Sequence, residues 1–180
     1  MLKWLIRGRL AAYEKKFGYD MGYAREILAA DTRAFFAFAK VMKLGAYRRD
    51  VPKDVYWATK LTGVLSADCG PCTQLVVTLG LADGVDPKVM SSVIAGDDAA
   101  LAEPIKLAVA FARAAIAHDV AADDLRDEIK KRWGSRALVA LAFAITESRM
   151  YPMLKYALGH GKTCQRVVVA GTPVAVVRAA

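Results

Sequence analysis

The feature that most constrains this 180-residue chain is the segment Cys69–Cys72, Cys-Gly-Pro-Cys, which lies where one helical pattern ends and another begins. Pro71 suits the first turn of a helix, where its missing N–H costs nothing, so it predicts a helix that starts at this motif. Two thiols at this spacing can close a disulfide or share a metal. Backbone N–H groups at a helix N-terminus favour thiolate, the reactive form of cysteine. We therefore expect the chemistry of the chain to centre on Cys69 and Cys72.

Apolar residues recur at helical spacing along most of the chain, and Gly, Pro or Asp separates the patterns. No Gly-rich loop follows a strand pattern, which excludes the Rossmann and P-loop nucleotide-binding classes. Pro152 is expected to kink or break the last helix. The valine runs on either side of Gly171-Thr172-Pro173 predict extended chain or a small hairpin. The fold class is therefore predicted as all-α with a short extended C-terminal tail, and helices are expected over residues 2–17, 23–44, 53–67, 71–81, 87–95, 103–117, 123–133 and from 135 onward.

Positive charge is concentrated in the first fifty residues. They hold eleven Lys and Arg against five Asp and Glu, a surplus of six within the net charge of +8. We interpret residues 1–50 as a basic helical arm and residues 51–180 as an all-helical core with its tail, within one structural domain overall. Such an arm can attract nucleic acid or an anionic membrane surface, but a solvated helix face or an oligomer contact is the favoured reading. No nucleic-acid partner is predicted.

Composition limits the class of protein further. Hydrophobic residues make up 56% of the chain, which excludes a disordered protein. No apolar run is long enough to span a bilayer, and the N-terminal residues lack the apolar core of a signal peptide, so a cytoplasmic location is expected. Three cysteines, two of them as C-x-x-C, suit a reducing compartment and a redox or metal role better than a secreted disulfide scaffold.

The tetrapeptide is the one that thioredoxins carry, so that family needs a test. Thioredoxin-like proteins place it after a β-strand, with Trp directly before the first cysteine. In this chain a helical pattern precedes the motif, and Asp68 stands before Cys69. The tetrapeptide therefore supports dithiol chemistry but does not predict the thioredoxin fold.

A second resemblance covers more of the chain. Three local patterns follow one another along the chain. They are the small-residue segment that leads into the cysteine pair, Ser66–Cys72, then the helix end at Leu79-Gly80-Leu81, then the capped helix start at Asp86-Pro87-Lys88-Val89. In this order, from about Val51 to Gly159, the chain resembles the alkylhydroperoxidase D-like and carboxymuconolactone decarboxylase-like superfamily. The resemblance implies an all-helical bundle that assembles as a homo-oligomer, a trimer or hexamer, with a dimer as the alternative. It implies peroxide reduction by the dithiol and no cofactor.

The chain departs from the peroxidase members of that superfamily at two positions. Those members carry a Glu twelve residues before the first cysteine and a His four residues after the second, and these groups relay protons. Trp57 and Val76 occupy the corresponding positions here, and neither can act as an acid or base. Nearby residues that can support the thiols are Lys60, Thr73 and Gln74. Only Lys60 among these is ionisable, and its cation near a cysteine would favour thiolate.

The roles within the pair stay open at this stage. The resemblance implies that Cys72 is the peroxidatic thiol and Cys69 the resolving one, whereas general C-x-x-C logic gives the reverse. In either case a thiolate attacks peroxide to give a sulfenic acid, the second thiol condenses with it, and an external dithiol reduces the disulfide. Asp68 can cap the following helix, while its charge opposes thiolate formation. Without the Glu and His relay we expect slow peroxide turnover, or a disulfide substrate instead.

Other readings of the chain remain as alternatives. The pair can be an inert structural feature, or it can bind a metal together with His160 and Cys164, the only further ligands in range of this pattern. The protein can be a carboxymuconolactone decarboxylase-like lyase, which needs no cysteine, or a non-catalytic oligomeric assembly or binding protein. Cys164 either packs or serves as a third, resolving thiol. Glu147 lies in an otherwise apolar helix and can be a buried acid, although such a Glu more often pairs with a neighbour such as Arg149 or faces solvent.

Overall fold

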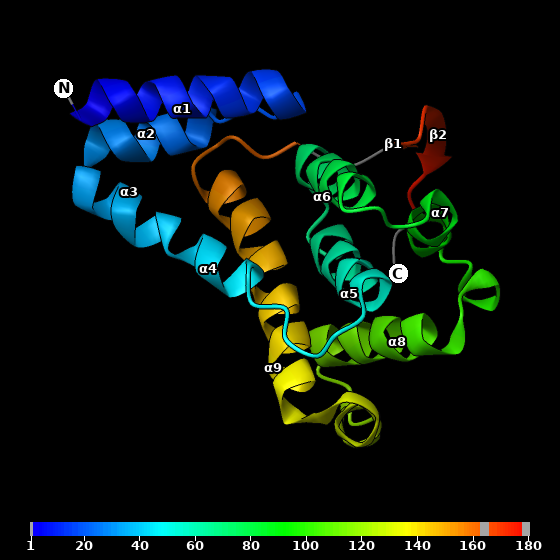
Figure 1. The fold of residues 1–180 in the computed structure, drawn as a ribbon. Coiled ribbons are helices and arrows are strands. Elements are labelled where there is room, and N and C mark those ends of the chain that lie inside the picture. The colour runs from blue at the N-terminus through cyan, green and yellow to red at the C-terminus, as the bar shows by residue number, and fades with distance from the viewer. Residues whose placement is uncertain (1, 163–165, 178–180) are drawn as a thin grey trace.

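A computed structural model describes residues 2–162 and 166–177 of the chain (Figure 1). Most of these residues are helical and a single hairpin follows the last helix, which confirms the mostly helical class predicted from the sequence. The elements are α1 (Leu2–Phe17), α2 (Gly22–Ala30), α3 (Thr32–Ala39), α4 (Val41–Gly45), α5 (Lys53–Leu65), α6 (Gly70–Ala82), α7 (Pro87–Ala95), the 3-10 turn η1 (Asp98–Ala100), α8 (Glu103–Ala117), α9 (Ala122–Ala157), β1 (Arg166–Val169) and β2 (Thr172–Ala175).

Helix α5 is the centre of the core. It packs against α6, α7, α8 and α9, and ten consecutive residues of it, from Val55 to Val64, are buried. A helix that is covered on every side needs partners for its polar groups as well as apolar packing. The hydroxyls of Thr59 and Thr62 donate to carbonyls one turn earlier, those of Val55 and Ala58, at 2.8 and 2.9 Å. These internal bonds let two threonines occupy the middle of the core.

The N-terminal helices lie together along one side of the molecule, as Figure 1 shows for α1 and α2. An Arg25–Glu14 pair with two contacts of 2.6 Å joins them. Ile6 of α1 and Leu28 of α2 are buried in the same hydrophobic core as α5. The basic residues of α1 and α2 therefore lie on helices whose other face is part of the core.

The single helix predicted for residues 23–44 is wrong: the segment forms α2, α3 and α4. Asp31 ends α2 in an extended conformation, with φ of −153°, and its carboxylate accepts the backbone N–H of Arg33 at 2.7 Å. An aspartate that can bond the backbone in this way favours a helix start over a helix interior. The apolar periodicity continues across Asp31, which is why the spacing alone predicts one helix.

The long helix α9 is interrupted at one predicted position and continuous at another. Gly134 has φ of 82° and ψ of 172°, so the chain turns there between the two helical stretches that the sequence predicts. Helix α9 continues past Pro152 to Ala157, and the break expected at this proline is absent. Pro152, Ser148 and Lys155 are all buried on the inner side of the helix. Packing of that face holds the helical path although proline supplies no N–H.

The valine-rich tail, predicted as extended chain or a small hairpin, forms a hairpin whose turn begins one residue before the predicted Gly171-Thr172-Pro173. Strands β1 and β2 pair antiparallel around Ala170 and Gly171, whose φ angles are 47° and 85°. Two consecutive positive φ angles are typical of the tight turns that suit a twisted hairpin. The hairpin packs on α6 and α7 of the same chain, and Val167 and Val169 are buried there. None of the helices described by the structure is both long enough and apolar enough to cross a membrane.

Candidate dithiol site

Cys69 and Cys72 form a disulfide at the N-terminus of α6. Cys69 occupies the N-cap position in an extended conformation, Pro71 lies in the first turn, and the two Cα atoms are 5.3 Å apart. This separation is within the range that a disulfide requires. The helix start predicted from Pro71 is confirmed. Cys69 is fully buried and Cys72 is 4% exposed, so both cysteines are nearly inaccessible to solvent.

Hydrogen bonds fix the motif from two directions. The Thr73 N–H and hydroxyl both donate to the Cys69 carbonyl, at 2.9 and 3.0 Å, which closes the first turn of α6. The Gly70 N–H donates to the Lys162 carbonyl at 3.0 Å, which attaches the segment after α9 to the motif. Thr73, one of the residues singled out in the sequence, is therefore a structural support of the dithiol turn.

Tyr19 contacts the disulfide from a distant part of the sequence. Its hydroxyl oxygen lies 3.5 Å from the Cys72 sulfur, and the side chain is only 4% exposed. A disulfide sulfur carries no hydrogen, so the phenol must be the donor in this contact. Tyr19 comes from the short connection between α1 and α2, and nothing in its sequence spacing indicates that it meets Cys72. It is a site residue that the sequence analysis missed.

Lys155 of α9 is buried beside this tyrosine. Its ammonium lies 4.5 Å from the ring centre of Tyr19 and 5.4 Å from that of Tyr23, and the residue is 1% exposed. Among the residues that the structure describes, no carboxylate is within 4.0 Å of this ammonium. Burial lowers the pKa of Lys155, while the charge of nearby Asp20 opposes that shift. A cation over aromatic faces is a stabilising arrangement when both are removed from water.

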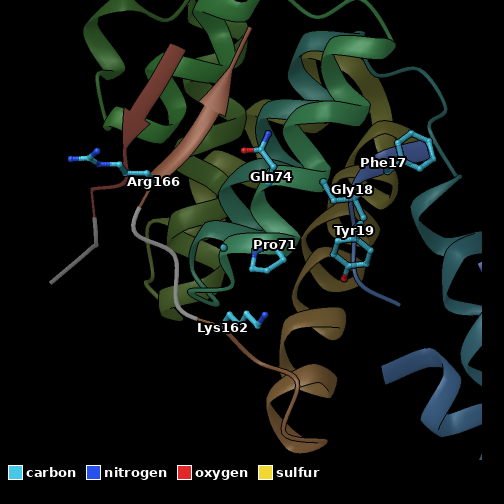
Figure 2. A pocket seen from close by; sticks show the side chains of 9 residues that line it. Phe17, Gly18, Tyr19, Pro71, Gln74, Lys162 and Arg166 are labelled. Atoms are coloured by element: carbon cyan, nitrogen blue, oxygen red, sulfur yellow. The ribbon is translucent and has the colours of Figure 1, made fainter. Parts of the chain in front are cut away.

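A pocket of about 510 Å³ opens beside the motif. Figure 2 shows Pro71 and Tyr19 side by side in this pocket, with Lys162 and Arg166 near its edges. Tyr19 thus borders the pocket and also reaches Cys72, which makes it the side chain that connects the two. The pocket is lined by Phe17, Gly18, Tyr19, Gly70, Pro71, Gln74, Leu75, Lys162 and Arg166.

Lys60 has its contacts away from the thiols. Its ammonium lies 2.9 Å from the Glu147 carboxylate, with both side chains nearly buried, and 5.6 Å from the ring centre of Trp57. None of its contacts in the described part of the chain is with a cysteine. Glu147 is buried, which is the less favoured of the sequence interpretations, and its partner is Lys60 on α5 instead of Arg149.

Gln74 and Asp68 also have structural surroundings. The Gln74 amide donates to the Val168 carbonyl at 2.9 Å and accepts the Val168 N–H at 2.8 Å, so it clamps strand β1 onto α6. Asp68 has φ of 45°, and its carbonyl accepts the hydroxyl of Tyr156 at 2.8 Å. Cys69, and not Asp68, takes the N-cap position of α6.

The two positions that lack the peroxidase relay are part of the core. The Trp57 indole donates to the Asp83 carboxylate at 2.7 Å, and this bond, with help from Arg48, lowers the pKa of Asp83. Val76 is 6% exposed. Neither side chain gains an acid or base function from its surroundings, as the sequence predicts.

The tyrosines near the site give a prediction for alkaline titration. Burial raises the pKa of Tyr23 to about 12 and raises the pKa of Tyr19, Tyr56 and Tyr151 further. A raised phenol pKa contributes stability that is fully present below pH 10 and is lost as the pH rises through the folded-state value. We expect the tyrosinate absorbance at 295 nm to rise less between pH 9 and 11 in the folded protein than in urea. Equal rises would contradict this burial.

The structure gives no support to a metal site. In the described ranges, no three His, Cys, Asp or Glu side chains are grouped as metal ligands. His160 follows the end of α9, and its Nε2 is 2.7 Å from the Glu26 carboxylate. Cys164, the other suggested ligand and the suggested third thiol, lies outside the described residues.

Comparisons with protein-family models, with curated proteins and with solved structures found no match to this chain. The likeness to the alkylhydroperoxidase D-like superfamily therefore rests on the residues quoted for it.

Proposed function

We propose that this chain is a thiol-based oxidoreductase that reduces small peroxides through Cys69 and Cys72. The observation that carries the proposal is the disulfide between these two cysteines at the N-terminus of α6, next to a pocket. A helix N-terminus stabilises thiolate, and the spacing of the pair lets the second thiol resolve an oxidised first one. A C-x-x-C pair placed in this way is typical of redox chemistry.

The proposed cycle has three balanced steps. One cysteine thiolate attacks the terminal peroxide oxygen, the O–O bond breaks, and the products are a cysteine sulfenic acid and an alkoxide that takes a proton from water. The other cysteine thiol condenses with the sulfenic acid, which forms the Cys69–Cys72 disulfide and releases water. An external dithiol then reduces this disulfide and is itself oxidised to a disulfide. No cofactor enters the cycle.

Burial of the pair favours a small substrate. Thiol–disulfide exchange with a folded protein requires a bulky disulfide to approach the attacking sulfur directly. With Cys69 fully buried and Cys72 only 4% exposed, a hydroperoxide fits this restricted approach better than a protein disulfide does. We therefore place peroxide or alkylhydroperoxide ahead of a disulfide as the substrate.

The family and the assembly belong to the same proposal. An alkylhydroperoxidase D-like bundle accounts for the order of the sequence motifs. We propose that this bundle assembles as a trimer or hexamer and is located in the cytoplasm. The exposed apolar residues of α1 support self-association, since Leu2, Trp4 and Leu5 are 54%, 76% and 55% exposed. Apolar side chains gathered on one helix in this way are typical of a surface that another subunit covers.

Turnover of hydrogen peroxide with dithiothreitol as the reductant tests the function. The wild type is expected to consume many equivalents of peroxide per chain, whereas Cys69→Ser and Cys72→Ser each lose most of the turnover because the Cys69–Cys72 disulfide can no longer form. A Cys164→Ser variant that retains turnover assigns the cycle to the pair. Turnover that survives unchanged in Cys69→Ser and Cys72→Ser would overturn the proposal.

A further inference from the structure

We propose that Tyr19 is a catalytic residue of this dithiol, donating a hydrogen bond to the Cys72 thiolate, and that Lys155 is the positioning residue behind it. The inference rests on the proposed function and deepens it, because it identifies Cys72 as the attacking sulfur. Tyr19 would also give the cysteine pair a polar partner, which Trp57 and Val76 do not provide.

The geometry around Cys72 indicates which of the two thiols ionises. The Tyr19 oxygen is 3.5 Å from the Cys72 sulfur, within hydrogen-bond range for sulfur, and a disulfide sulfur can only accept. Reduction leaves two thiol groups, and the one beside an O–H donor gains more from ionising than the other. The Tyr23 hydroxyl is a second partner for the same phenol, so Tyr19 is shared between the sulfur and Tyr23. Thr73 bonds only to the Cys69 backbone carbonyl. The phenol therefore selects Cys72 as the thiolate.

The cation beside Tyr19 strengthens the hydrogen bond that the phenol donates. The Lys155 ammonium lies 4.5 Å from the centre of the Tyr19 ring, where it draws electron density from the phenol and makes its O–H a stronger donor. Burial raises the pKa of the Tyr19 phenol, so the phenol is neutral and can donate at neutral pH. Other titratable groups that act on Tyr19 or Lys155 are Tyr13, Tyr23, Tyr151, Asp20 and Lys162. Only Asp20 among these carries a negative charge at neutral pH.

These contacts define the roles in the oxidation step. The Cys72 thiolate gives its electron pair to the peroxide oxygen and becomes the sulfenic acid, while Tyr19, which lines the pocket, donates its hydrogen bond to the sulfur. The leaving alkoxide takes a proton from water in the pocket. Cys69, which is fully buried, then attacks the Cys72 sulfur, releases water and restores the disulfide. In this order Cys72 reacts first and Cys69 resolves.

The test measures ionisation of Cys72 without any peroxide. In a Cys69→Ser/Cys164→Ser background, Cys72 is the only thiol, because the chain has three cysteines. Adding Tyr19→Phe is expected to move the midpoint of thiolate absorbance at 240 nm to higher pH by about one to two units, since hydrogen bonds to charged groups change an equilibrium about 10- to 100-fold. Alkylation by iodoacetamide at pH 7 should slow accordingly.

Tyr13→Phe is the matched control. It removes one phenol hydroxyl from the same aromatic cluster, with ring centres 6.5 Å apart between Tyr13 and Tyr19. We expect this variant to keep the parent midpoint. Equal shifts in the two variants, or no shift in Tyr19→Phe, would overturn the assignment. Lys155→Met should shift the midpoint in the same direction as Tyr19→Phe.

This readout separates the two proposals. A shifted midpoint together with absent peroxide turnover would keep the Tyr19 assignment and reject the peroxidase function. Normal turnover with an unshifted midpoint would keep the function and reject Tyr19 as its donor.

Discussion

Replacing Glu147 by Gln is expected to lower the free energy of unfolding by about 3 kcal/mol or more. The carboxylate lies 2.9 Å from the Lys60 ammonium, and the two side chains are 6% and 11% exposed. Gln has nearly the shape of Glu, so the change removes the charge without opening a cavity. Lys60 would then be a buried cation without its counterion, which is the costly case for a buried ion pair.

The paired substitution separates charge from packing. We expect Lys60→Met/Glu147→Gln to be clearly more stable than Glu147→Gln alone, because neither position then carries an uncompensated charge. Urea unfolding of the two single variants and the double variant measures this coupling. A double variant whose loss equals the sum of the single losses would show that the two residues do not stabilise one another. The Cys72 thiolate midpoint should stay unchanged in Lys60→Met, since Lys60 contacts Glu147 instead of the dithiol.

Gly63→Ala is expected to destabilise the protein by about 1–3 kcal/mol, because it overpacks the crossing of α5 and α9. A Cβ at Gly63 would overlap the Ser148 hydroxyl and lie 3.3 and 3.4 Å from the carbonyl oxygen and Cα of Ile145. The Ser148 hydroxyl cannot swing away freely, since it donates to the Ile145 carbonyl at 3.0 Å. Both neighbours belong to the buried face of α9, so the two helices must separate.

Gly80→Ala is the matched control for this crossing. A Cβ there meets the terminal methyl of Met90, which is the far end of a flexible side chain, and its next neighbours are Trp57 ring atoms at 3.5 Å. Met90 can adopt another rotamer, so the expected loss is smaller than at Gly63. Thermal and urea unfolding of both variants checks the order. A Gly80→Ala variant that is less stable than Gly63→Ala would contradict this account of the interface.

Local signals predicted most of the helix boundaries. Asp86 caps α7 through the Lys88 N–H at 2.9 Å, Gly96 ends it with φ of 69°, and His118 ends α8 with φ of 58°. Each of these residues acts on backbone groups within a few positions, so the sequence contains the whole cause. Asp31 acts in the same local way, yet the unbroken apolar spacing around it indicated one longer helix.

The surroundings of the dithiol could not be predicted in the same way. Pro71 places Cys69 and Cys72 at a helix start, which is local information. Tyr19 reaches Cys72 from the connection between α1 and α2, and Lys155 of α9 lies over the Tyr19 ring, and a lone tyrosine or lysine in the sequence gives no sign of such contacts. Lys60 is ionisable and close to the motif in sequence, but its ammonium pairs with Glu147 on α9, which is far from Lys60 in sequence.

The most direct test of the central claim is thiol counting by intact mass on the reduced protein, before and after one equivalent of hydrogen peroxide. The account predicts rapid loss of two thiols in the wild type, and a sulfenic acid trapped at Cys72 in Cys69→Ser but at no site in Cys72→Ser. If all three thiols stay reduced and alkylate slowly, the dithiol is not a peroxide-reactive centre, and the proposed function is wrong.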